Sequence, residues 1–120
     1  MNELNESKRT YLKAIRALGK DGARVRNVDI AAALGYSRPS VTNAVRKLAA
    51  EGLVTVTKNE IVLTESGAAE ADGLMEKRAV IEALLLKMGA PAAVAAENAD
   101  LLAGVITDEL YETVKNLRNT

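Results

Sequence analysis

The stretch from Val28 to Val54, VDIAAALGYSRPSVTNAVRKLAAEGLV, constrains the fold more than any other part of the chain. A first predicted helix ends at Leu34, because Gly35 can enter the left-handed conformation that terminates helices. Ser37 can then cap a second helix by accepting a backbone N–H, and Pro39 is tolerated in a first helical turn. The pattern predicts two helices joined by a tight turn, which is a helix-turn-helix.

The second predicted helix has one apolar face and one polar face. Its apolar residues follow the spacing i, i+3, i+4 and i+7, which places them on a stripe that packs inward: Val41, Ala44, Val45 and Leu48. The opposite face carries amides, hydroxyls and cations that suit base edges and phosphates in the major groove. The candidate DNA-binding residues here are Ser37, Arg38, Pro39, Ser40, Thr42, Asn43, Arg46 and Lys47.

An ordinary helical hairpin with a solvated polar face would show the same pattern, so the next segment matters. Residues 53–64, LVTVTKNEIVLT, place β-branched residues on both sides of a polar Lys58-Asn59-Glu60 tip, which predicts a β-hairpin. A hairpin at this point is the wing of a winged helix-turn-helix. Lys58 at its tip could reach a phosphate and is a further DNA-binding candidate.

The N-terminal residues predict one more helix in front of this unit. Residues 7–20 carry a stripe that should pack under the helix-turn-helix, made of Tyr11, Ala14, Ile15 and Leu18. Asp21-Gly22 is a turn signal, residues 23–26 suit a short extended piece, and Asn27 is expected to cap the next helix.

The C-terminal residues predict a helical region. Thr64 is expected to cap a long helix that runs to Met88, with an apolar row of Leu74, Ile81, Leu85 and Met88 that Arg78 interrupts. Further helices are predicted over residues 92–106 and after a cap at residues 107–109. We therefore expect a mainly α fold with a small β-hairpin wing, consisting of a winged helix-turn-helix DNA-binding domain (1–64) and a helical dimerisation domain (65–120).

The two short helices at the C-terminus should have no core of their own to fill, so a second copy of the chain is the expected partner. A twofold homodimer also fits double-stranded DNA, because it places two reading helices on half-sites about one helical turn apart.

Composition argues against many other functions. The chain contains no Cys and no His, so the commonest zinc ligands, thiol nucleophiles and neutral-pH imidazole bases are missing. No nucleophile with a base and no phosphate-binding Gly-rich loop is evident, and we expect no enzyme, although a catalytic carboxylate pair stays open. With three Tyr and no Trp or Phe, stacking platforms for single strands are not expected. The chain has no leader and no apolar run of about 18 residues, which predicts a cytoplasmic protein with no membrane partner.

Charge is distributed unevenly along the chain. Residues 1–60 hold eleven Lys or Arg and six Asp or Glu, whereas residues 61–120 hold five and ten. The zero net charge therefore conceals a basic half that suits phosphates and an acidic half that does not. Chance segregation of solvated charge is the competing interpretation.

These motifs resemble those of the metal-dependent transcriptional repressors, a family that includes the diphtheria toxin repressor and the manganese transport regulator. The resemblance spans nearly the whole chain and is carried by YLKAI (11–15), DIAAALGYSRPSVTNAVRKLAAEGLV (29–54) and IVLTESG (61–67). It implies a dimeric DNA-binding repressor. A Leu-Thr-x-x-Gly after the wing also occurs in MarR-type regulators.

The resemblance also implies a divalent metal, manganese or iron, that joins the first helix to the dimerisation domain. Aligned with the family, the ligand positions fall on Thr10, Lys13, Arg78, Asp100, Ala103 and Gly104. Only Asp100 could coordinate a cation, so we expect no metal cofactor at the family site. Our hypothesis is that Arg78, aided by Lys13, replaces the metal's charge and pairs with Asp100 or another carboxylate. The competing interpretation is that Arg78 only extends its guanidinium to water.

Two other functions stay open from sequence. One is an effector-gated, MarR-like regulator with a small-molecule pocket between the winged domain and the tail. The other is a winged-helix protein-interaction adaptor, because fold alone does not decide function.

Overall fold

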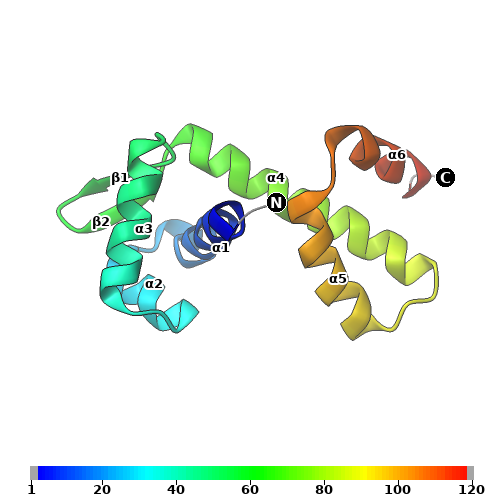
Figure 1. Cartoon of the computed structure of the whole chain (residues 1–120), viewed down its shortest axis with the longest axis horizontal. Coiled ribbons are helices and arrows are strands. Elements are labelled where there is room, and N and C mark those ends of the chain that lie inside the picture. The colour runs from blue at the N-terminus through cyan, green and yellow to red at the C-terminus, as the bar shows by residue number, and fades with distance from the viewer. Residues whose placement is uncertain (1–2, 119–120) are drawn as a thin grey trace. The chain divides into compact units, whose positions relative to one another are not determined.

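The computed structural model describes residues 3–118, which form six α-helices, a short 3-10 helix and a two-stranded sheet (Figure 1). The predicted mainly α fold with a hairpin wing is confirmed. Two compact units divide between Ala71 and Asp72, inside the fourth α-helix. The sequence suggested a boundary between residues 64 and 65, but the first unit extends further because Ala71 is 0% exposed in its core.

Helix α1 (Glu3–Leu18) begins and ends before the predicted range of 7–20. It ends where the chain turns into a 3-10 helix, η1 (Lys20–Gly22), in which Asp21 has a positive φ of 62°. The buried stripe of α1 includes Leu12, which is 1% exposed and which the sequence analysis missed. Ala14, which was placed on that stripe, is only half-buried.

Helices α2 (Asn27–Leu34) and α3 (Arg38–Ala50) form the predicted helix-turn-helix. Gly35 ends α2 with φ 71° and ψ 28°, in the left-handed region. The predicted capping role of Asn27 is wrong, because Asn27 is the first helical residue. The cap position belongs to the residue before it, Arg26. The backbone N–H of Arg26 donates to Asp29 Oδ2 at 2.9 Å, so the Asp29 carboxylate provides a hydrogen-bond partner at the start of α2.

The wing consists of β1 (Val54–Thr57) and β2 (Glu60–Leu63), which pair antiparallel from Val54 opposite Leu63 to Thr57 opposite Glu60. Only Lys58 and Asn59 form the tip, with φ values of 50° and 66° that a two-residue type I′ turn requires. Glu60 therefore belongs to β2 rather than to the tip. The extended residues 23–26 lie beside β2, where the Val25 carbonyl accepts from the Ile61 N–H at 2.8 Å.

The first unit, which contains the wing and is called the winged unit below, has a core that is mainly aliphatic. This core is shared by α1, α2, α3, the wing and the start of α4 (Glu65–Lys87). Its buried members are Tyr11, Leu12, Ile15, Val25, Ile30, Val41, Val45, Leu48, Leu53, Val54, Ile61 and Ala71. The α3 stripe predicted from its spacing is thus buried, with Ala44 partly buried beside it. This core holds α3 by its apolar side and leaves the polar side facing outward.

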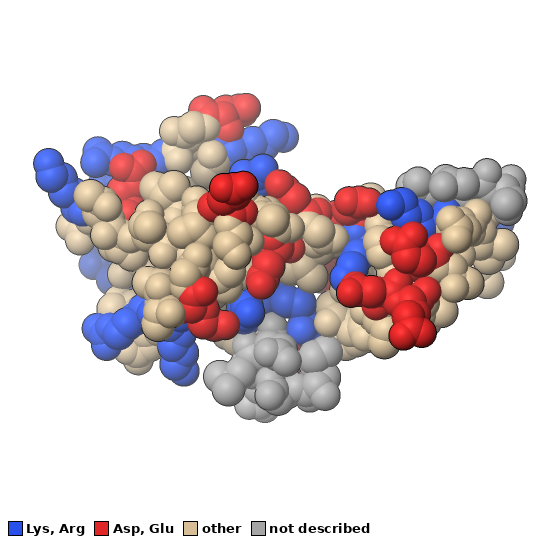
Figure 2. Space-filling view, turned by 90° about the horizontal axis from the view of Figure 1, so that it is seen from above, with Lys and Arg blue, Asp and Glu red and all other residues tan. Residues whose placement is uncertain are grey.

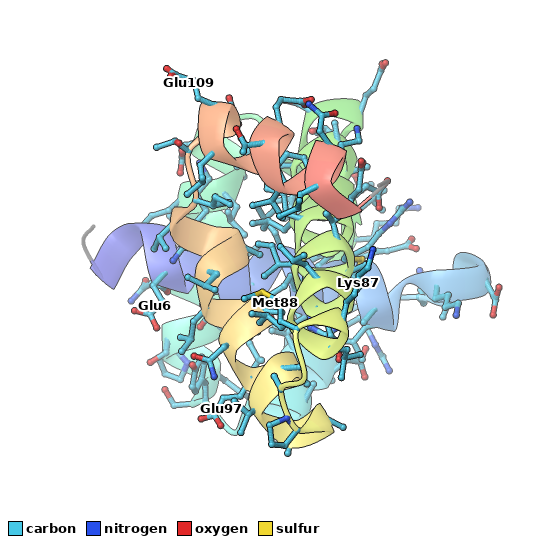
Figure 3. The ribbon with its side chains drawn as sticks, turned by 90° about the vertical axis from the view of Figure 1, so that its right-hand side faces the viewer. Glu6, Lys87, Met88, Glu97 and Glu109 are labelled. Carbon is cyan, nitrogen blue, oxygen red and sulfur yellow. The ribbon has the colours of Figure 1, made fainter. Side chains whose placement is uncertain are left out.

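The second unit contains the rest of α4 with α5 (Ala92–Val105) and α6 (Asp108–Arg118), whose side chains are drawn in Figure 3. Contrary to expectation, these helices have a small core of their own, formed by Ile81, Ala99 and Ala103 with Leu85, Ile106 and Val114 against it. Met88 does not join it, since α4 ends at Lys87 and the Met88 side chain is 73% exposed. Along the described part of the chain, no helix is both long and apolar enough to cross a membrane.

Candidate nucleic-acid interface

The outward face of α3 carries most of the candidate residues. Arg38, Pro39, Ser40, Asn43, Arg46 and Lys47 are all exposed. All of these except Arg38 share this face, because Val41, Val45 and Leu48 occupy the opposite one in the core. Arg38 lies on the side of Val45 by helical spacing and is exposed at the first turn. The structure thus brings Arg46, Lys47 and the Asn43 amide together on a single helix face, the arrangement needed to meet base edges and phosphates at once.

Ser37 performs the capping role that its position predicted. Its Oγ accepts from the Ser40 N–H at 3.3 Å, and its hydroxyl donates to Ser40 Oγ at 2.9 Å. The first turn of α3 contains no acidic residue. Pro39 has no N–H and the Ser40 N–H is already capped, so the backbone acts at this end mainly through the helix dipole. No carboxylate of the first turn offsets that dipole, which favours an anion such as phosphate.

Thr42 differs from the other candidates on α3. Its side chain is half-buried, and its Oγ1 accepts from Asn27 Nδ2 at 3.0 Å. The hydroxyl therefore links α3 to the start of α2 and is less available to DNA than the sequence suggested. Asn27, placed at a cap by sequence, instead positions the reading helix through this bond.

Several cations around α3 have no acidic partner. Arg38, Arg46, Lys47 and Lys58 form no ion pair with any residue in the range 3–118, and all four are exposed. Two other basic residues of this unit are paired, since Lys8 lies 3.2 Å from Glu51 and Arg24 lies 3.6 Å from Glu60. Lys20 of η1 is exposed and makes no ion pair with the described residues. The unpaired cations are therefore concentrated on α3 and at the wing tip, where they are free to neutralise phosphates.

In the face drawn in Figure 2, Lys and Arg side chains project from the edges of the winged unit, while Asp and Glu lie on both units. In the winged unit, Lys58 lies at the exposed tip of the hairpin that follows α3. A cationic tip on a short β-ribbon is suited to a phosphate next to the groove that the helix enters.

Residues 3–62 match the family model described as iron dependent repressor, N-terminal DNA binding domain. The chain belongs to the iron-dependent repressor family. The match covers the first helix, the helix-turn-helix and nearly all of the wing, the elements that carry the exposed cations.

Similar proteins support this assignment. The transcriptional regulator MntR of Escherichia coli O6:H1 is 27% identical over 106 residues, which cover 88% of this chain and 68% of that protein. The iron-dependent repressor IdeR of Mycobacterium tuberculosis is 34% identical over 87 residues, which cover 72% of this chain and 38% of IdeR. The crystal structure of ScaR with bound Cd²⁺ has a TM-score of 0.84 and 30% identity, covering 93% of this chain and 53% of that one.

The residues at the positions of the family's metal ligands do not suit a divalent cation in this member. Thr10 Oγ1 donates to the backbone carbonyl of Glu6 at 3.0 Å, and Lys13 brings a positive charge. Ala103 is buried in the small C-terminal core and, like Gly104, has no donor atom on its side chain. Within residues 3–118 no group of three or more His, Cys, Asp or Glu is placed to hold a metal ion.

Arg78 lies next to the one carboxylate left at these positions. Its Nη1 is 3.3 Å from Glu82 Oε1, and its Nε is 3.9 Å from Asp100 Oδ1. The pairing with Asp100 that we hypothesised from sequence is therefore present, with α4 supplying the cation and α5 the anion. A dication beside Asp100 would meet this guanidinium, so the local charge disfavours a metal.

Sequence reasoning missed one residue of this surface. Tyr36 lies in the turn between α2 and α3, and its side chain is 46% exposed. The signal that could have found it is its place between Gly35 and Ser37, because a residue in the turn directly before a reading helix has little room to enter the core.

Proposed function

We propose that this chain is a homodimeric, sequence-specific transcription regulator that represses by binding double-stranded DNA through α3 and the wing, without the metal of its family. The observation that supports the proposal most is the exposed face of α3. It presents Arg46 and Lys47, with Arg38 exposed at the first turn of the helix, and none of the three has a carboxylate partner among the described residues. The proposed role is regulatory rather than enzymatic.

In this proposal the residues of α3 divide between base edges and phosphates. Asn43 and Arg46 lie three positions apart on the exposed face and carry the two side-chain types that best read adenine and guanine. Ser40, Lys47 and Lys58 are suited to phosphates on either side of the groove. Specificity is thus assigned to two side chains, and general affinity to the rest.

The homodimer is supported by exposed apolar side chains of the second unit. On α5, Val94, Leu101, Leu102 and Val105 are exposed, while the smaller Ala95, Ala99 and Ala103 are buried. Leu110 and Leu117 of α6 are exposed as well. A concentration of large aliphatic side chains in contact with water is typical of a protein–protein interface, and a second copy of this surface is the proposed partner.

Action without metal is supported by the contacts of Arg78. The guanidinium carries a permanent positive charge between Glu82 and Asp100, so these carboxylates need no metal to offset their mutual repulsion. The proposal therefore assigns to a side chain of this protein the charge that a metal supplies in its relatives.

The test is selection of genomic DNA fragments by the purified full-length protein at one fixed salt concentration, with EDTA or with MnCl₂. Recovery of the same sequences with equal affinity in both conditions is the expected result. Arg46→Ala should weaken binding to the selected fragment, and Lys87→Ala, which removes an exposed cation from α4, should not.

Other outcomes would overturn separate parts of the proposal. Selective binding only with MnCl₂ would show that a metal is required. Equal binding to every sequence would contradict the assignment as a sequence-specific regulator. If Lys87→Ala lost as much affinity as Arg46→Ala, binding would depend on charge alone rather than on the α3 face.

A further inference from the structure

Tyr36 lies in a hydrogen-bonded turn directly before the cap of the reading helix α3. Its backbone N–H donates to the Ala31 carbonyl at 3.2 Å, beside the Gly35 N–H, which donates to the same carbonyl at 2.9 Å. Ser37, the next residue, is the cap of α3. The Tyr36 side chain therefore leaves the chain at a defined point next to the N-terminus of α3.

The ring of Tyr36 packs against the ring of a core residue, Tyr11. Its centroid lies 5.9 Å from that of Tyr11, with the two ring planes tilted by 55°. Tyr11 belongs to the core and is 4% exposed, so it cannot easily move aside. A tilted aromatic pair of this kind is favourable, and it stabilises this orientation of the Tyr36 ring.

The hydroxyl groups near this turn are not equally available. The Ser37 hydroxyl donates to Ser40 Oγ, and Thr42 Oγ1 accepts from Asn27. The Tyr36 hydroxyl makes no hydrogen bond with any residue whose position the structure describes. It is an uncharged donor on a half-exposed ring that contacts Tyr11, two residues before the start of α3.

We infer that Tyr36 is an additional DNA-contacting residue, whose phenolic O–H donates to a phosphate oxygen beside the groove that receives α3. Tyr side chains are among those that bond the DNA backbone, and such bonds fix register without reading sequence. Tyr11 is then a positioning residue, because it sets the direction of the Tyr36 ring. This inference rests on the proposed function and adds a contact to the same surface.

The experiment measures the affinity of the full-length protein for a random-sequence 30-base-pair duplex over a range of salt concentrations. Tyr36→Phe, which keeps the ring on Tyr11 and removes only the hydroxyl, should weaken binding about 3- to 10-fold. The slope of log affinity against log salt should stay unchanged, since a neutral phenol releases no counterion. Lys47→Ala, which removes a cation assigned to phosphates, should lower that slope by about one when measured in parallel.

The control is Tyr111→Phe, the same chemical change in the second unit, which should bind as the wild type does. Wild-type affinity of Tyr36→Phe together with weakened Lys47→Ala would overturn the Tyr36 contact and leave the proposed function intact. If Lys47→Ala also bound normally, the proposed function itself would fail. Binding of Tyr36→Phe weakened on one selected sequence but not on the random duplex would exclude the phosphate contact.

Discussion

Gly67 of α4 packs directly against the backbone carbonyl of Leu53, so closely that a β-carbon on residue 67 would overlap the carbonyl oxygen. The contact brings the start of the long helix onto the chain that enters the wing. The same carbonyl accepts from the Thr64 N–H at 3.0 Å. The lack of a side chain at residue 67 is therefore a condition for docking α4 on the winged unit.

Replacing Gly67 with Ala should destabilise the protein by about 1–3 kcal/mol, because the added methyl group forces two backbone segments apart. Gly73→Ala is a matched control in the same helix, where a β-carbon would meet nothing within 4 Å. That variant should gain up to about 1 kcal/mol from helix propensity. Urea unfolding of both variants measures the difference, and equal stabilities would contradict the close contact.

Thr64 joins the same two segments through its side chain. Its Oγ1 accepts from the Gly67 N–H at 3.0 Å as a helix cap and donates to the Gly52 carbonyl at 2.7 Å. Thr64→Val keeps the shape but loses both bonds, and should lower the free energy of unfolding by about 1–2 kcal/mol. Thr64→Ser should retain most of the stability. Thr113→Val, whose exposed hydroxyl bonds only within α6, should change it by less than about 0.5 kcal/mol.

Leu101 is the most exposed leucine of the second unit, with 61% of its surface accessible, and it lies on the apolar face of α5. Leu101→Glu would place a charge in the proposed dimer interface, so the variant should sediment as a monomer with an unchanged helical circular dichroism spectrum. Glu97→Gln alters an exposed side chain of the same helix (Figure 3) and should remain dimeric. A wild-type protein that is monomeric at every concentration tested would contradict the proposed homodimer.

Arg78→Ala should reduce stability only slightly, by about 0–1 kcal/mol, because both of its ion pairs are partly exposed. If Arg78 replaces the charge of a metal, DNA affinity should fall more than stability does, and Arg78→Lys should recover part of it. Lys87→Ala removes another cation from α4 and serves as the control. Unchanged folding and unchanged DNA affinity in Arg78→Ala would show that the guanidinium has no organising role.

Alkaline pH should destabilise the protein through Tyr11. Burial, with a smaller effect of nearby Tyr36, raises the pKa of the Tyr11 hydroxyl above its ordinary value of 10.0. The unfolded chain then loses this proton at a lower pH than the folded chain, so the contribution of Tyr11 is constant below about pH 10 and stability falls above it. Tyr11→Phe should reduce this fall in thermal unfolding experiments between pH 9 and 11, and an identical pH profile would contradict the shift.

Local signals determined most of the DNA-facing unit. Gly35 and Ser37 act within one turn of the residues that they affect, through a left-handed backbone and a cap, so their roles could be read from spacing alone. The apolar period of α3 also identified its buried stripe, because the other face is too polar to bury. Ala103 and Gly104 carry no donor atom on their side chains in any fold, but the absence of the family's metal stays a prediction.

Only the tertiary structure decided the remaining features, because they depend on partners distant in the chain. Helix α5 has apolar residues on both sides. The spacing of these residues along the sequence does not show that the alanines pack inward and the leucines face water. The bond from Asn27 to Thr42 and the ring contact of Tyr11 with Tyr36 join residues on different elements. Spacing along a helix determines which residues share a face, whereas close packing between elements determines which face is buried and which side chains remain free to bind.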